Sequence, residues 1–70
     1  MEFKDRLKTI RKEKGMTQHE VELNSGLAIN TLKQYESGKR LPNYCGIIAL
    51  CKGLDVSADY LLGISYSYTK

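Results

Sequence analysis

MTQHEVELNSGLAINTLKQYESGKR, which spans residues 16–40, contains two short helical patterns separated by a glycine. Thr17 is a good helix N-cap, and Glu20 three residues later completes a capping box. A first helix is therefore expected over residues 18–24. Gly26 follows it, and a glycine at this point allows the backbone to turn with a positive φ angle.

The second helical pattern covers residues 29–36. Leu32 and Tyr35 place apolar side chains at a three-residue step, and Ser37-Gly38 provides the residues of a C-cap. Two helices joined by a turn of about three or four residues that contains glycine form a helix-turn-helix. The second helix of such a motif can lie in a DNA major groove.

Apolar residues near the amino terminus predict an amphipathic helix. Phe3, Leu7 and Ile10 recur at steps of four and three residues, which is the spacing of one helix face. This helix is expected over residues 3–14, and Gly15 should end it.

The segment after Pro42 predicts two further helices. Asn43 can cap a helix that continues to Leu54, although two glycines inside it should weaken it by roughly 0.5–1 kcal/mol each. Ser57 can cap a short fifth helix over residues 58–62. The pattern therefore predicts an all-α chain with five helices.

Several short pieces of this sequence occur in a distinctive order and spacing. They are Thr17-Gln18, Ser25-Gly26-Leu27, Leu32, Tyr35-Glu36-Ser37-Gly38-Lys39-Arg40, Pro42 and the ending LDVSADYLLG at residues 54–63. Together they resemble the Cro/repressor-type helix-turn-helix family. The resemblance implies a compact five-helix domain that binds duplex DNA, usually as a dimer on a two-fold operator. We expect this domain over residues 1–63, followed by a short tail or linker over residues 64–70.

Composition places the chain among small globular proteins. Its 70 residues suffice for one domain with a small core. The formal net charge is only +3, so any DNA binding must depend on where the cations lie. No apolar stretch approaches the roughly 18 residues that span a bilayer, and the amino terminus lacks the apolar core of a signal peptide. We therefore expect a cytoplasmic protein that does not contact a membrane.

The sequence lacks the residue combinations of a catalytic or metal site. Cys45 and Cys51 fall in one expected helix, where their Cα atoms would lie about 9 Å apart and could not form a disulfide. His19 is the only histidine, so neither a zinc site nor a Cys/His nucleophile is expected. We expect no enzyme activity, no catalytic residue, no cofactor and no metal.

Docking geometry identifies the candidates for reading DNA bases. In a helix-turn-helix, the first residues of the second helix meet base edges in the major groove. Asn and Gln side chains can bond adenine, and an apolar side chain can cover a thymine methyl group. The base-reading candidates are Ile29, Asn30, Thr31, Lys33 and Gln34, and the resemblance implies Ile29, Asn30 and Gln34 in particular. The alternative is that these side chains only fill the helix start or face solvent.

Candidates for phosphate contacts flank the base-reading residues. Thr17 and Gln18 open a helix whose N–H groups and positive dipole end suit an anion. Ser37, Lys39 and Arg40 follow the second helix in a loop that offers backbone N–H groups and two cations. Such contacts set the register on DNA and carry little sequence information. The alternative is a solvated pair of loop charges.

The resemblance also concerns the frame that holds the second helix. Arg11 should pair with Glu36 and tie this helix to the scaffold. Ala28 stands where the family usually has Ser or Thr, so the N-cap should be weaker by about 1 kcal/mol. Glu22 stands where the family usually has Ala, at the close crossing of the two helices. Its carboxylate must reach solvent, find a partner or separate the helices.

Two classes of function remain open. The first is a sequence-specific, repressor-like regulator that binds a palindromic operator as a homodimer. The second is a protein-interaction module of the same fold, such as an antitoxin-like or bridging partner. The polar second helix and the basic loop favour the first. Subunits are expected to pair through Tyr60, Ile64, Tyr66 and Tyr68, and the alternative is a disordered terminus.

Overall fold

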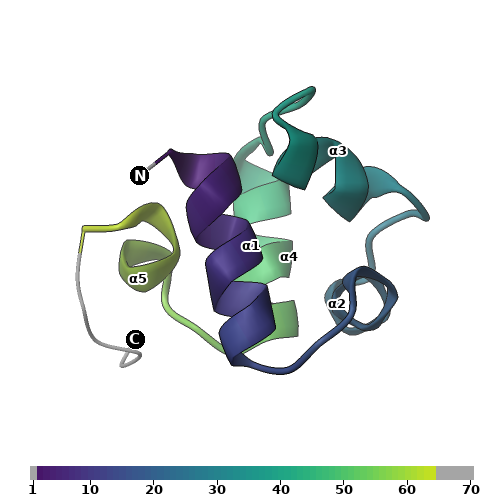
Figure 1. The fold of residues 1–70 in the computed structure, drawn as a ribbon, viewed down its shortest axis with the longest axis horizontal. Coiled ribbons are helices and arrows are strands. Elements are labelled where there is room, and N and C mark those ends of the chain that lie inside the picture. Colours follow the sequence, from purple (N-terminus) through teal and green to yellow (C-terminus); the bar gives the residue numbers. More distant parts are fainter. Residues whose placement is uncertain (1, 65–70) are drawn as a thin grey trace.

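Five α-helices form the regular secondary structure of residues 2–64, the part of the chain that this computed structural model describes. They are α1 (Phe3–Glu13), α2 (Gln18–Ser25), α3 (Thr31–Ser37), α4 (Tyr44–Leu54) and α5 (Ala58–Leu62). Figure 1 shows α2 and α3 on one side of α1, α5 on the other side, and α4 behind. The predicted all-α, five-helix architecture is confirmed. None of these helices is long and apolar enough to cross a membrane.

Three of the helices begin at the N-caps that the sequence predicts. In each, a side-chain oxygen accepts a hydrogen bond from the backbone N–H three residues later, which satisfies a donor that the helix itself leaves unpaired. The pairs are Thr17 with Glu20 at 3.1 Å, Asn43 with Gly46 at 2.9 Å, and Ser57 with Tyr60 at 3.1 Å. The Thr17 N–H in turn donates to the Glu20 carboxylate at 2.8 Å, so the predicted capping box is confirmed.

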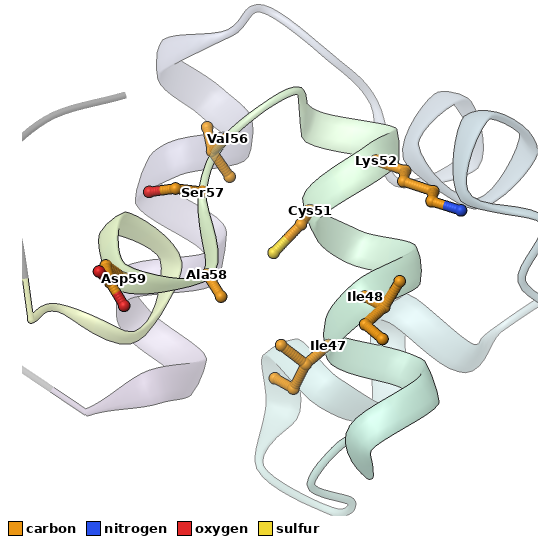
Figure 2. A pocket seen from close by; sticks show the side chains of 8 residues that line it. All are labelled: Ile47, Ile48, Cys51, Lys52, Val56, Ser57, Ala58 and Asp59. Carbon is orange, nitrogen blue, oxygen red and sulfur yellow. The ribbon is translucent and has the colours of Figure 1, made fainter. Parts of the chain in front are cut away.

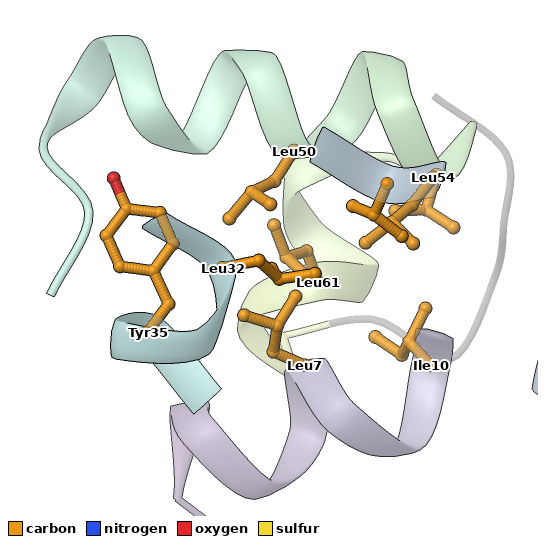
Figure 3. Close-up of a cluster of buried hydrophobic side chains, with 9 residues drawn as sticks. Leu7, Ile10, Leu32, Tyr35, Leu50, Leu54 and Leu61 are labelled. Carbon is orange, nitrogen blue, oxygen red and sulfur yellow. The ribbon is translucent and has the colours of Figure 1, made fainter. Parts of the chain in front are cut away.

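All five helices contribute side chains to one hydrophobic core. Figure 3 shows side chains from α1, α3, α4 and α5 pointing toward one another. Val21 from α2 and Val56 from the link before α5 complete the cluster. The labelled members are Leu7, Ile10, Leu32, Tyr35, Leu50, Leu54 and Leu61. Because burying one such side chain stabilises a protein by about 1.5–3 kcal/mol, this cluster sets the positions of the helices.

The glycines inside α4 allow close packing. A Cβ atom added at Gly53 would overlap the Ser25 hydroxyl at the end of α2. A Cβ atom added at Gly46 would lie 2.8 Å from Pro42 Cβ and 3.1 Å from the Tyr35 hydroxyl. The two glycines therefore weaken the helix locally but let α2 and the end of α3 approach α4.

The start of α3 differs from the prediction. The helix begins at Thr31 rather than near Ile29, and its N-cap residue is Asn30. Asn30 has a left-handed backbone (φ 71°), a conformation that asparagine tolerates better than most residues. The Thr31 N–H closes a turn onto the Ala28 carbonyl at 3.2 Å. Ala28 lies in the turn before the helix and is not the N-cap, so the expected position was wrong, but the N-cap residue Asn30 makes no side-chain capping hydrogen bond, in line with the expected weak cap.

Candidate nucleic-acid interface

The turn between α2 and α3 begins at Gly26 as the sequence predicts, but it covers residues 26–30 and is longer than the three or four residues expected. Gly26 ends α2 with φ 74°, in the left-handed region that glycine adopts without a steric penalty. The next N–H group, that of Leu27, donates to the Glu22 carbonyl at 3.0 Å. The Leu27 side chain packs against the core. These contacts reverse the chain and bring α3 back across α2.

The outward face of α3 carries polar and cationic side chains. Asn30, Lys33, Gln34, Ser37 and Lys39 line one shallow hollow on the surface. The hollow thus brings three base-reading candidates together with two phosphate-binding candidates. Two side-chain amides and two ammonium groups at one concave surface suit the acceptor-rich edge of a DNA groove and its phosphates.

The other two base-reading candidates lie outside that hollow. Ile29 precedes α3, and 75% of its surface is exposed. Thr31 is the first residue of the helix and is half-buried. Ile29 and Asn30 therefore stand on the turn before α3 rather than within its first helical turn.

The loop after α3 uses its backbone N–H groups internally. The N–H groups of Lys39 and Arg40 both donate to the Gln34 carbonyl, at 3.0 Å and 3.3 Å. The Ser37 hydroxyl donates to the same carbonyl at 3.1 Å. The expectation that these backbone N–H groups are open to phosphate was therefore wrong. The exposed cations of Lys39 and Arg40 remain, and Arg40 Nη1 lies 3.5 Å from the Gln34 side-chain oxygen.

A buried ion pair fastens α3 to the scaffold. Arg11 Nε donates to Glu36 Oε2 at 2.7 Å and Arg11 Nη2 donates to Glu36 Oε1 at 3.2 Å, so the pair is bidentate. Arg11 Nη1 also donates to the Met16 carbonyl at 2.8 Å. The side chains are 12% and 2% exposed, respectively. This is the contact that the sequence resemblance implied between the first helix and the end of the second motif helix.

Gln18 joins the same network. Its Nε2 atom donates to Glu36 Oε1 at 3.1 Å, so the side chain points from α2 toward α3. Thr17 is exposed, but its hydroxyl oxygen is already the acceptor of the α2 capping box. The hydroxyl also donates to the Glu20 carboxylate, so Thr17 reaches a phosphate only if it gives up that bond. The Gln18 side chain therefore links α2 to α3 through a hydrogen bond.

Glu22 is a residue whose role sequence reasoning did not resolve. Its side chain is buried, with 5% of the residue exposed, and its Oε2 atom accepts the Leu32 N–H at 3.0 Å. Of the three outcomes that the sequence left open for this carboxylate, the structure shows a partner. The sequence carried a signal of this contact in two departures from the family pattern. They are Glu22 on α2 and Ala28, a residue that cannot cap α3.

The comparisons with known proteins agree with this geometry. A family described as helix-turn-helix matches residues 7–61. This chain belongs to the Cro/repressor-type helix-turn-helix family. The match includes α2, α3 and the ion-paired residues Arg11 and Glu36. No solved structure matches the chain.

Three curated relatives are similar over most of this chain. The HTH-type transcriptional regulator YqaE of Bacillus subtilis is 40% identical over 60 residues, which cover 86% of this chain and 52% of the relative. The cryptic phage CTXphi transcriptional repressor RstR of Vibrio cholerae is 33% identical over 90% of this chain and 56% of its own length. The HTH-type transcriptional regulator y4dJ of Sinorhizobium fredii is 42% identical over 69% of this chain and 62% of its own length. The chain thus spans about half the length of the first two relatives.

A second concave surface of this family member lies between α4 and α5. Figure 2 shows Ile47, Ile48 and Cys51 on α4 facing Val56 and Ala58 across an apolar groove. Lys52, Ser57 and Asp59 also line it. The groove is thus formed by α4, α5 and the link between them, and Figure 1 shows α5 on the opposite side of α1 from α3.

The surface expected to pair two subunits is only partly described. Tyr60 is half-buried, with the Arg6 guanidinium 5.0 Å from its ring centre and Arg6 Nε donating to its carbonyl at 2.7 Å. The expectation that Tyr60 offers open apolar area was therefore wrong. Ile64 is 72% exposed, as expected. Tyr66 and Tyr68 lie outside the described residues.

Proposed function

We propose that this chain is a sequence-specific, duplex-DNA-binding transcriptional regulator that acts as a repressor and reads the major groove with α3. The observation that carries the proposal is the hollow on α3, where Asn30, Lys33 and Gln34 stand beside Lys39. Family membership supports DNA binding, and the name of one relative, a phage transcriptional repressor, supports repression.

We assign a role to each side chain of the proposed interface. Asn30 and Gln34 read adenine edges, Ile29 covers a thymine methyl group, and Thr31 and Lys33 complete the base-reading set. Lys39 and Arg40 neutralise phosphates with their side chains. The Ser37 and Thr17 hydroxyls add contacts only when they give up their bonds to the Gln34 carbonyl and the Glu20 carboxylate. Gln18 donates one of its two Nε2–H groups to Glu36, which leaves the other for a phosphate.

We further propose that two copies bind a palindromic operator. One recognition helix spans only a few base pairs, and a net charge of +3 supplies little general affinity for DNA. Two copies on half-sites one helical turn apart, roughly 34–36 Å, would double the contacts with the duplex. The surface we assign to pairing is the α5 end of the molecule, where Leu62 and Ile64 are exposed.

The decisive experiment separates base reading from phosphate contact. Binding sites are first selected from random duplexes, and affinities for the best site and for random duplex are then measured across salt concentrations. Asn30→Ala should cost about 1–3 kcal/mol on the best site and leave binding to random duplex nearly unchanged. Lys39→Ala should weaken binding to all duplexes alike and lower the slope of log K against log salt by about one.

Two results would overturn the proposal. If Asn30→Ala and Lys39→Ala behave identically on the selected and the random duplexes, the division into base-reading and phosphate-binding residues is wrong. If no duplex is selected above competitor DNA, the runner-up function, a protein-interaction module, becomes the better account. The apolar groove between α4 and α5 is the feature that favours that second function.

A further inference from the structure

We propose that Glu22 is a positioning residue for DNA reading: from α2, its carboxylate caps the recognition helix and so determines where α3 begins. This inference rests on the proposed function, because it concerns how the base-reading residues are presented. Glu22 itself is buried and stands behind them. Its effect on DNA recognition would therefore be exerted through the backbone of α3.

The need for such a cap follows from the start of α3. In most helices the N-cap residue itself supplies a side-chain oxygen to the N–H of the second or third helical residue. Here the N-cap is Asn30, whose side chain forms no capping hydrogen bond within the described part of the chain. Leu32 is the second residue of α3, and it is fully buried. A buried N–H without an acceptor would be costly, and the Glu22 carboxylate is the acceptor that the structure provides.

Glu22 also holds the other end of the same turn. Its backbone carbonyl accepts the Leu27 N–H at 3.0 Å, and its side chain accepts the Leu32 N–H at 3.0 Å. One residue of α2 therefore anchors both ends of the segment 27–32, which carries Ile29 and Asn30. A carboxylate is suited to this position because a charge-assisted hydrogen bond is stronger than a neutral one and the helix N-terminus attracts negative charge.

The cap matters for recognition because a side chain can form hydrogen bonds with a base only in the right orientation. Asn30 adopts its left-handed conformation between the two anchored ends, and a bidentate bond to a base requires its amide in one orientation. Phosphate contacts from Lys39 and Arg40 come from the far end of α3 and tolerate small shifts. Loss of the cap should therefore reduce discrimination between DNA sequences more than it reduces general affinity.

The test uses Glu22→Ala and Glu22→Gln, with Glu13→Gln as a control for an exposed glutamate. The first measurement is amide hydrogen exchange at Leu32 in the protein without DNA. We expect Glu22→Ala to speed this exchange by about tenfold or more, a factor that corresponds to about 1.4 kcal/mol. Glu22→Gln keeps a weaker, neutral acceptor and should give a smaller increase. Glu13→Gln should leave the exchange unchanged.

The second measurement is the ratio of affinities for the selected and the random duplex. Glu22→Ala should lower this ratio by about tenfold at an unchanged salt slope, and Glu22→Gln should restore most of it. Leu32 exchange that is unchanged in Glu22→Ala would overturn the cap. An unchanged affinity ratio with faster Leu32 exchange would overturn the positioning role.

The two measurements also separate this inference from the proposed function. If the native chain selects no duplex, the proposed function fails, whereas the exchange data still report on the cap. If circular dichroism shows that Glu22→Ala is unfolded, Glu22→Gln decides alone. Faster Leu32 exchange in Glu22→Gln than in Glu13→Gln would then support the cap, and equal exchange would overturn it.

Discussion

At the scale of single residues, α3 depends on two buried glutamates. Glu36 accepts two bonds from Arg11 and one from Gln18, and Glu22 accepts the Leu32 N–H. A buried carboxylate is tolerated where it is hydrogen-bonded, and Glu36 accepts bonds at both oxygens while Glu22 accepts one at Oε2. The two residues hold opposite ends of one short helix, so the polar face of α3 is presented by a rigid support.

Removing Glu36 should be costly. Glu36→Ala leaves the largely buried Arg11 guanidinium without its carboxylate, and we expect a loss of about 3 kcal/mol in the free energy of unfolding. Urea denaturation measures this loss, and DNA binding should weaken although Glu36 contacts no base. The double variant Arg11→Met/Glu36→Met should be more stable than Glu36→Ala, because it leaves no buried charge unpaired. A single variant that is as stable as Glu13→Ala would contradict this role.

At the scale of helices, N-cap residues set where a helix starts, and small residues set how closely two helices pack. The capping box lowers the pKa of the Glu20 carboxyl below its usual value of 4.5, because the carboxylate accepts hydrogen bonds from the Thr17 N–H and hydroxyl. The glycines of α4 act differently, since they allow neighbouring helices to approach its backbone. The capping box and the glycines of α4 therefore predict different responses to substitution.

The capping box should make stability depend on pH. Since the Glu20 pKa is lowered on folding, its contribution is present above pH 4.5 and is lost as the pH falls through the lowered value. Urea denaturation at several pH values between about 6 and 3 should therefore show a smaller acid-dependent loss in Glu20→Gln than in the native chain. Glu13→Gln should keep the native profile. A native profile in Glu20→Gln as well would contradict the contribution of the box.

Gly53→Ala should destabilise the fold although alanine is the better helix former. The new methyl group would overlap the Ser25 hydroxyl, and such overpacking costs about 1–3 kcal/mol against a helix-propensity gain of roughly 0.5–1 kcal/mol. Thermal unfolding followed by circular dichroism measures the balance. Cys45→Ala, at an exposed position of the same helix, is the control and should change stability little. A higher melting temperature for Gly53→Ala would show that α2 and α4 can separate without loss.

At the scale of the whole molecule, the recognition surface and the proposed pairing surface lie apart. Figure 1 shows α3 and α5 on opposite sides of α1, so a second copy at α5 would leave the α3 face open to DNA. The net charge of only +3 supplies little general attraction to DNA, so we expect a single copy to bind weakly. Two-fold symmetry would turn this weak contact into a specific one.

Sedimentation tests this arrangement. We expect two copies of the 70-residue chain on palindromic DNA and one copy, bound more weakly, on a single half-site. Removal of residues 64–70 should reduce binding to the palindrome more than binding to the half-site. A monomer that binds one half-site with undiminished affinity after this truncation would contradict the proposed dimer.

The sequence by itself determined the features that depend on near neighbours. The N-caps at Thr17, Asn43 and Ser57 each involve an N–H three residues away, so the residue types predict them directly. The same holds for the turn at Gly26, and the helix-turn-helix followed from these local signals. The ion pair of Arg11 with Glu36 required the family resemblance as well, because its partners lie in different helices.

The tertiary structure alone decided where α3 begins and which side chains from other helices form hydrogen bonds with it. Glu22 meets Leu32 across ten positions of sequence, and Gln18 meets Glu36 across eighteen, only because folding crosses α2 over α3. The helix starts at Thr31 rather than near Ile29, and the acceptor for the N–H of its second residue is a carboxylate from another helix. Patterns within one helix cannot report such a contact, since the acceptor belongs to a different part of the chain.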